Sequence, residues 1–314
     1  MEEKIMQFAN FNITFGNENQ PMLDHFEDVI YPAFTGGYIR GKKDEVPRYS
    51  FSDVKIKELN GEYVLVGNYI KDTEYKVITT VQKGNLISSP AEVPTAPFSR
   101  FIIFLKNHRM VLVRNEKSSP DIRSFQKTVR EILSKHINTQ NRGREKEDKL
   151  PIAIVHIVDI PLKDSIEEVL KGVQKINFLK MRFFPLNNDL DPNPLAQAMR
   201  ENMKQVGSKT GNLIFNTPGS KKGVKEIMAS TGGLAVVSMK VTDDDGETRQ
   251  IKEDAFSSNK KFPYSGNLSS EGDPYLVEFA QKDSIVTVTS AENASLYERV
   301  KGKIKRLMQE FVSA

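Results

Sequence analysis

The sequence predicts a mixed α+β (α/β) protein, with an antiparallel, β-rich N-terminal domain and a C-terminal domain in which strands and helices alternate. Two apolar runs, Phe101 to Leu105 and Met110 to Val113, are short and rich in β-branched and aromatic residues. Such runs are typical of strands buried on both faces. Asn60-Gly61, between two further strand-like segments, is a strong signal for a hairpin. After residue 150, segments with helical spacing separate the apolar runs, which predicts an alternating architecture.

The domain boundary is predicted from a polar segment in the middle of the chain. Residues 138–149 contain no aliphatic or aromatic side chain and interleave charges of both signs, as linkers and exposed loops do. We therefore expect a β-rich domain with one long helix at 1–140, a linker at 138–150 and an α/β domain at 151–314.

The N-terminal half is expected to consist mainly of strands. A short helix is expected at 21–30, because its apolar residues recur at helical spacing. Asn107-His108 would close the hairpin between the two apolar runs, since Asn tolerates positive φ. The expected strands are Lys4 to Phe15, Tyr49 to Leu59, Glu62 to Ile70, Glu74 to Gln82, and the two runs of the hairpin.

A long helix is expected after the hairpin. Ser119 and Pro120 would be its N-cap and first residue, with Asp121 at the positive end of the helix dipole. Ile122, Phe125, Val129, Ile132 and Leu133 then form one apolar stripe.

In the C-terminal half we expect helices to begin near Asp164, at Pro194 and after Ser220, followed by a final helix from Glu292. Its apolar stripe runs from Leu296 to Phe311, and a polar loop is expected at 257–274. The expected strands are Ile152 to Val158, Phe178 to Phe184, Leu213 to Phe215, Leu234 to Val241, Tyr275 to Ala280 and Ile285 to Thr289.

Composition excludes several classes of protein. The chain of 314 residues contains no cysteine, which rules out disulfides and thiolate metal sites, and its four histidines have no metal-ligand spacing. No apolar stretch reaches the roughly 20 residues needed to span a bilayer, and the first residues lack the form of a signal peptide. We expect a cytoplasmic protein without cofactor or metal. A net charge of +4 is too small to indicate a nucleic-acid partner by itself.

The distribution of positive charge is more informative than its total. On the long helix, Arg123, Lys127 and Arg130 recur at i, i+4 and i+7, so they share one face. Arg299, Lys303 and Arg306 repeat this spacing on the last helix. Arginine contacts phosphate in a bidentate manner. The two stripes therefore predict binding to a phosphate backbone rather than reading of bases, although lysines on a helix are more often merely solvated.

Two loops are further candidates for phosphate binding. Lys221 and Lys222 begin a helix after a glycine-containing turn, where free N–H groups and the helix dipole attract anions. A capped helix with solvated lysines is the simpler interpretation. Arg40, Lys42 and Lys43 lie in a glycine-rich segment, for which a flexible surface loop is likewise the simpler interpretation.

No motif indicates catalysis. There is no P-loop, G-x-S-x-G motif or Ser/His/Asp grouping, and a hairpin turn explains Asp243 to Gly246 better than a metal site does. Asp72, Glu74 and Lys76 bear a slight likeness to the carboxylate–lysine sets of metal-dependent nucleases, but their spacing does not suit two neighbouring strands.

The order of these parts resembles RexA-like phage exclusion proteins and the KwaB component of Kiwa antiphage systems. The resemblance rests on the hairpin Phe101 to Val113, the segment Ser118 to Ile122, the strand-and-helix unit Ile152 to Phe184 and the basic helix Arg299 to Arg306. It implies a DNA-binding protein of antiviral defence that forms a homodimer. It also implies a small membrane-protein partner, through which the chain would become membrane-associated.

We therefore predict a component of an antiphage defence system that binds double-stranded DNA largely independently of sequence. The alternative is a metal-dependent nuclease or a nucleotide-acting enzyme of such a system. We expect both helix stripes to contribute more to binding than Lys221 and Lys222, because helix-borne side chains lose less rotamer entropy on binding.

Overall fold

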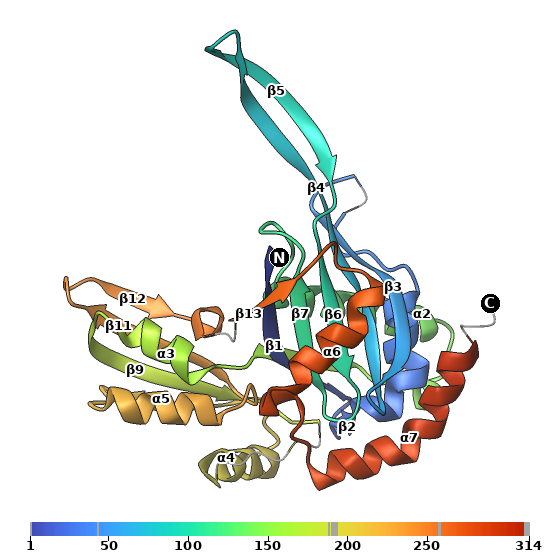
Figure 1. Ribbon diagram of the computed structural model, residues 1–314. Coiled ribbons are helices and arrows are strands. Elements are labelled where there is room, and N and C mark those ends of the chain that lie inside the picture. Colours follow the sequence, from blue (N-terminus) through green and yellow to red (C-terminus); the bar gives the residue numbers. More distant parts are fainter. Residues whose placement is uncertain (1, 43, 188, 190–193, 257–258, 311–314) are drawn as a thin grey trace.

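The structure is a computed structural model that describes residues 2–42, 44–187, 189, 194–256 and 259–310. It confirms the predicted mixed α+β class. The N-terminal part forms a curled antiparallel half-barrel sheet, and the C-terminal region alternates helices and strands (Figure 1).

The large sheet has nine strands, with the main order β13-β1-β7-β6-β4-β3. Strand β1 pairs with β2, β7, β8 and β13, all antiparallel, and is the central strand of the fold. The strands of this sheet are β1 (Glu2–Phe15), β2 (Gln20–Pro21), β3 (Arg48–Leu59), β4 (Glu62–Gln82), β5 (Asn85–Thr95), β6 (Phe98–Phe104), β7 (Arg109–Arg114), β8 (Ala153–Asp159) and β13 (Asn259–Tyr264).

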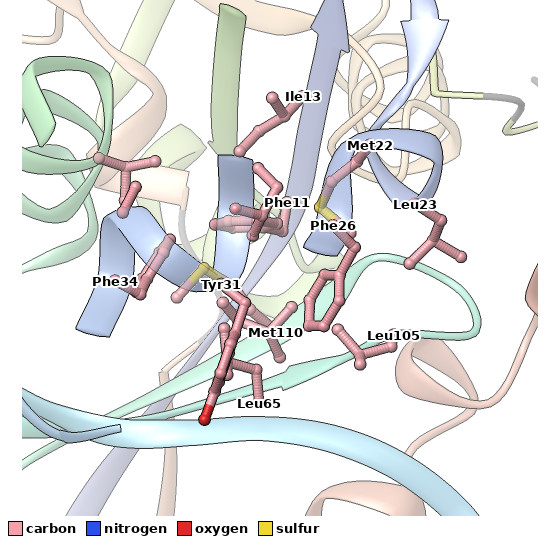
Figure 2. Close-up of a cluster of buried hydrophobic side chains, with 14 of the residues drawn as sticks. Phe11, Ile13, Met22, Leu23, Phe26, Tyr31, Phe34, Leu65, Leu105 and Met110 are labelled. Carbon is pink, nitrogen blue, oxygen red and sulfur yellow. The ribbon is translucent and has the colours of Figure 1, made fainter. Parts of the chain in front are cut away.

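Both faces of the large sheet are covered. Successive residues of β6 point to opposite faces of the sheet, so Phe101 and Ile102 enter two different hydrophobic cores. One core lies under α2 (Ile122–Gln140), α7 (Ala291–Glu310) and the helical segment η1 (Met22–His25), η2 (Phe26–Ile30) and α1 (Tyr31–Thr35). Figure 2 shows Phe11 of β1 gathered with Phe26 and Phe34 of this segment. The other core lies under α6 (Asp273–Gln281).

The predicted hairpin of β6 and β7 is confirmed, and residues 101–104 and 110–113 are fully buried. Within its turn it is His108, with φ 56°, that adopts positive φ rather than Asn107. The predicted helix start was wrong by two residues. Asp121 is the N-cap, and its side chain accepts the Ser124 N–H at 2.8 Å. The Ser119 hydroxyl instead accepts the Glu116 N–H.

Strands β4 and β5 form a long ribbon that projects beyond the sheet (Figure 1). We predicted a break before Glu74 and no strand after Asn85, whereas β4 is continuous over 21 residues and pairs with β5. Register places large apolar side chains on one face of the ribbon, where they are exposed. They are Tyr75, Val81, Leu86 and Val93, while the exposed Ile87 lies on the other face opposite Thr80.

The large sheet also includes strands from beyond the predicted linker. Strands β8 and β13 pair with β1, and α7 contributes to the first core. Helix α2 ends at Gln140, and the short turn η3 (Lys146–Asp148) leads toward β8. The division into domains at 1–140 and 151–314 stays a prediction.

A second sheet of four antiparallel strands has the order β10-β9-β11-β12. Three helices contribute to the core on one of its faces, together with strand residues such as Leu179 and Met239. The elements of this part are α3 (Lys163–Leu170), β9 (Val173–Phe183), α4 (Pro194–Gln205), β10 (Gly211–Asn216), α5 (Lys221–Ser230), β11 (Val236–Asp243), β12 (Thr248–Ile251) and η4 (Glu253–Phe256).

Four predictions for the C-terminal half were wrong. The expected strand 275–280 is helix α6, which has a proline at its start, and 285–289 contains the 3-10 turn η6 (Ser284–Val286) rather than a strand. The expected loop 257–274 contains β13 and the turn η5 (Ser270–Gly272). The spacing of Asp164 and Glu167 also predicts a capping box, but the N-cap of α3 is Leu162, which makes no side-chain bond.

Candidate nucleic-acid interface

The basic stripe of α2 lies on the exposed side of that helix. Arg123, Lys127 and Arg130 are exposed, while the apolar stripe on the opposite side is buried in the first core. Arg123 lies 4.0 Å from the Asp254 carboxylate, and Arg130 donates to the Val155 carbonyl at 3.1 Å. Within the described part of the chain, Lys127 makes no ion pair. Three exposed cations therefore lie on one helix face, with Arg123 beside a carboxylate and Arg130 bonded to a backbone carbonyl.

The α7 stripe has acidic neighbours that the sequence did not reveal. Arg299 donates to Asp24 at 2.6 Å, and Arg306 donates to Glu27 at 2.6 Å. Lys303, between them, lines a small cavity with residues of η1 and η2. Carboxylates beside these arginines would repel a phosphate, so this stripe is less suited to an anionic backbone than the α2 stripe.

The glycine-rich loop uses its arginine inside the protein. Arg40 donates to the Thr128 hydroxyl at 2.8 Å and to the Ser124 hydroxyl at 2.9 Å, and its guanidinium lies 3.8 Å from the centre of the Tyr49 ring. Lys42 is exposed and pairs with Glu45. The remaining predicted residue of this loop, Lys43, lies outside the described residues.

The turn before α5 is a capped helix start. The Ser220 side chain accepts the Gly223 N–H at 3.0 Å, as predicted. Lys221 lies 3.4 Å from the Leu170 carbonyl, and Lys222 is exposed. The structure does not bring these lysines together with the α2 stripe.

A basic surface that sequence reasoning did not propose lies on the face of the second sheet that the helices leave open. Along β9, Leu179, Met181 and Phe183 point into the core, while Lys180 and Arg182 point to the other side. This alternation of apolar and basic residues can be recognised in the sequence. What the sequence could not show is which strands flank β9 and which face the helices cover.

This surface forms a groove with the N-terminal end of α2. A cavity of about 360 Å³ is lined by Lys180 and Arg182 of β9, Ser238 of β11, Lys252 and Glu253 beyond β12, and also by Arg123 of α2. One predicted site residue, Arg123, is thus brought to a cluster of cations on a distant part of the chain.

Two titratable groups show that the α2 stripe and the sheet lie within electrostatic reach of each other. His156, on β8, stacks on Phe184 with ring centres 4.1 Å apart. Burial, followed by the charges of Arg182 and Arg130, lowers the pKa of His156 to about 4. Burial raises the pKa of Glu253, while Arg123 and Arg182 act to lower it. Arg182 therefore influences the pKa of both groups, together with Arg130 at His156 and with Arg123 at Glu253.

A buried carboxylate lies at the end of β8. Burial, and then the nearby charges of Glu253 and Asp121, raise the pKa of Asp159 to about 8. Its Oδ1 has no hydrogen-bond partner among the described residues. A carboxyl in this setting is stabilised in its protonated form.

The residues considered for a nuclease lie apart from this groove. Asp72 pairs with Arg48, and Lys76 pairs with Glu92 at 3.0 Å on the ribbon. Asp243 pairs with Arg249 at the start of the β11–β12 turn. Among the described residues, no three His, Asp or Glu side chains are grouped so that they could hold a metal ion.

Comparison with known proteins gives no relative. A scan against protein-family models, a search of curated proteins and a search of solved structures each find no match to this chain. In the described part of the chain, every helix is too short or too polar to cross a membrane.

Proposed function

We propose that this protein binds double-stranded DNA largely independently of sequence, as a component of an antiphage defence system. The observation that carries the DNA-binding part is the exposed stripe of Arg123, Lys127 and Arg130 on one face of α2. A rigid helix presents these cations at fixed spacing, so little entropy is lost when they meet phosphates.

Sequence independence follows from the chemistry of the stripe. Arginine and lysine bind phosphate oxygens, which carry no sequence information. Reading of bases requires a helix or ribbon that enters a groove with side chains aimed at base edges. The N-terminal end of α2 instead lies beside the second sheet, where Arg123 lines the cavity. Contacts to the backbone are therefore the binding mode that this stripe favours.

The two helix stripes are expected to contribute unequally to DNA binding. Both were predicted to contribute, but Asp24 and Glu27 already engage Arg299 and Arg306. Ion pairs at the surface are weak, so a phosphate could displace them at low cost, yet the carboxylates would remain nearby. We rank the α2 stripe first and the α7 stripe second, ahead of Lys221 and Lys222.

Fluorescence anisotropy with labelled duplexes of equal length and unrelated sequence tests this proposal. We expect similar affinities for all of them, falling steeply between about 50 and 200 mM salt because bound counterions are released. Changing the three α2 residues to Gln should weaken binding equally on every duplex. It should also lower the salt slope by about 2–3 for three lost phosphate contacts.

The same three-residue change on α7 and the Lys221/Lys222 change serve as comparisons and should have smaller effects. Tight binding confined to one sequence, or no binding even at low salt, would refute the proposal.

The setting in antiphage defence is drawn from the resemblance to RexA-like and KwaB proteins. It includes a cytoplasmic location, a homodimer and a small membrane-protein partner through which the chain would reach the membrane. The exposed apolar face of the β4–β5 ribbon supports the homodimer, because an isolated two-stranded ribbon is marginally stable in water. Two identical apolar faces pack against each other without repulsion in a two-fold dimer.

The alternative proposal is a metal-dependent nuclease or nucleotide-acting enzyme. The buried Asp159 and the half-buried Glu253, which lines the groove, favour it, because pKa values raised by burial often occur at catalytic sites. Incubation of the purified protein with labelled DNA, RNA and nucleotides in Mg²⁺ or Mn²⁺ tests this. Turnover that is lost on changing Asp159 or Glu253, or Asp72 or Glu74, would replace the binding proposal.

A further inference from the structure

We infer that the open face of the β10-β9-β11-β12 sheet seats the phosphodiester backbone of duplex DNA and forms the second wall of the groove begun by α2. This inference rests on the proposed function and adds a binding surface to it. The surface is defined by Lys175, Lys180 and Arg182 of β9 and Lys240 of β11, and it is called the open face below.

The register of the sheet places these cations together. Lys180 lies opposite Ser238, and Lys240 lies opposite Phe178, on the side away from the core. The remaining open-face positions are polar or apolar and carry no carboxylate: they are Asn212, Ile214 and Asn216 of β10, Val236 and Thr242 of β11, and Thr248 and Gln250 of β12. The strands of this face therefore present positive charge, and the acid that lines the same cavity, Glu253, lies beyond β12.

The helix-covered side of the same sheet has a different charge pattern. There Lys163 pairs with Glu226 at 2.6 Å, and Lys225 pairs with Glu167 at 2.7 Å. Lys171 likewise pairs with Glu168. Among the described residues, the cations of the open face form no such pair. A surface that merely needs solubility is well served by balanced charges, whereas an unbalanced positive face suits a polyanion.

The open face is continuous with the α2 stripe. Arg123 lines the same cavity as Lys180 and Arg182, and both Arg182 and Arg130 act on the pKa of His156. Arg123 of the helix and Lys180 and Arg182 of the sheet thus border one concave surface. A backbone bound to α2 would pass over Arg182 before it left the protein.

The length of the face matches a DNA backbone. Seven residue steps separate Lys175 and Arg182, which at the rise of an extended strand is about 23 Å. The phosphates of one DNA strand follow at about 3.4 Å along the helix axis, so this length corresponds to about seven base pairs. A DNA strand winds around the duplex over this length, so Lys and Arg along this line would contact only those phosphates that face the sheet.

The test compares two variants that each lose three positive charges from the same part of the chain. In the open-face variant, Lys180, Arg182 and Lys240 are changed to Gln. In the matched control, Lys163, Lys171 and Lys225 on the helix-covered side are changed to Gln. A third variant, Lys180→Arg with Arg182→Lys and Lys240→Arg, keeps the charge. Thermal melting of each variant verifies folding, and binding to a duplex and to its single strand is followed by anisotropy across salt concentrations.

We expect the open-face variant to lose at least tenfold in affinity for the duplex and about 2–3 from the salt slope. The control and the charge-preserving variant should bind like the unchanged protein. If the unchanged protein binds duplex but the open-face variant binds it equally well, the inference is overturned and the proposed function stands. An equal loss in the control, or a loss confined to single strands, also overturns it. Absence of duplex binding by the unchanged protein overturns the proposed function itself.

Discussion

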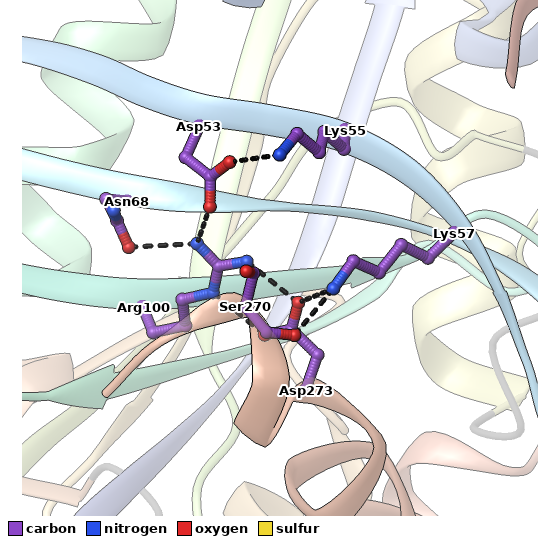
Figure 3. Close-up of polar contacts among 7 residues, drawn as sticks. All are labelled: Asp53, Lys55, Lys57, Asn68, Arg100, Ser270 and Asp273. Carbon is purple, nitrogen blue, oxygen red and sulfur yellow. Dashed lines mark hydrogen bonds and ion pairs between the residues drawn. The ribbon is translucent and has the colours of Figure 1, made fainter. Parts of the chain in front are cut away.

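A buried ionic network joins the large sheet to α6 and makes a sharp prediction for stability. Arg100 of β6 and Asp273 at the start of α6 are both fully buried. The Arg100 Nε and Nη2 donate to the two Asp273 oxygens, each at 2.8 Å (Figure 3). Nη1 donates to Asn68 at 2.9 Å and to Asp53 at 3.2 Å, while Lys57 donates to Asp273 at 2.7 Å. The network closes a contact between residues 173 positions apart.

The expected effect of Asp273→Asn follows from these contacts. The amide retains the shape but removes the negative charge from beside a buried guanidinium. Desolvation acts to lower the pKa of Arg100, and the Asp273 hydrogen bond and charge outweigh it, so the pKa is raised and the group stays charged. Removing one partner of a buried pair costs about 3–5 kcal/mol. Because Asp53 remains as a second carboxylate, we expect about 3 kcal/mol.

Urea denaturation of the two proteins measures this loss. The control is Asp243→Asn, which breaks the exposed ion pair with Arg249 and should cost much less. A double variant, Arg100→Met with Asp273→Leu, should recover part of the loss, because an apolar pair leaves no buried charge uncompensated. Equal losses for Asp273→Asn and Asp243→Asn would refute the reasoning that burial sets the magnitude.

Two further predictions concern the pH response and the ribbon. The folded pKa of Asp159 is raised from 3.8 to about 8, so the stability that its protonated form contributes is complete below the ordinary carboxyl pKa and is lost as the pH rises to about 8. Asp159→Asn should therefore diminish the loss of thermal stability between about pH 4 and pH 8. An unchanged pH profile would contradict this. On the apolar face of the ribbon, Val81→Lys with Leu86→Lys should shift a dimer to monomer in sedimentation velocity. Thr80→Lys on the opposite face should not, and a dimer that survives the first change would exclude this interface.

Local patterns predicted the hairpin, α2 and the α7 apolar stripe, because their periodicity persists over enough residues to identify them. The prediction of a strand at 275–280 was wrong for the opposite reason. It is a short apolar run whose length does not distinguish a strand from a buried helix, and the better signal was Asp273-Pro274 at the helix start. Strand β5 was missed because Pro94 argues against a central strand, yet β5 pairs with β4 alone, so its other edge is open.

From the sequence, the candidate site could be predicted only within single helices and strands. The spacing of Arg123, Lys127 and Arg130 places them on one face of a helix wherever that helix lies. Whether a carboxylate lies beside such a stripe depends on pairs distant in sequence, as with Arg299 and Asp24, which are 275 positions apart. The open face was hidden for the same reason. Neither the neighbours of β9 nor the face left uncovered follows from local pattern.

The geometry of the groove is fixed by contacts to the central strand β1. Strand β8 pairs with β1 along residues 9–15 and leads directly into α3 and β9. In the turn between α5 and β11, the Gly232 carbonyl accepts a hydrogen bond from Arg109 of β7, a neighbour of β1, at 3.0 Å. Gly233 has φ 77°, and an added Cβ would lie 3.0–3.2 Å from Ile160, Val158 and Asn10, so its backbone approaches β1 and β8 closely. The segment that enters β11 is therefore held against β1, β7 and β8, while α2 packs on β8. Both walls of the groove are thereby attached to the large sheet.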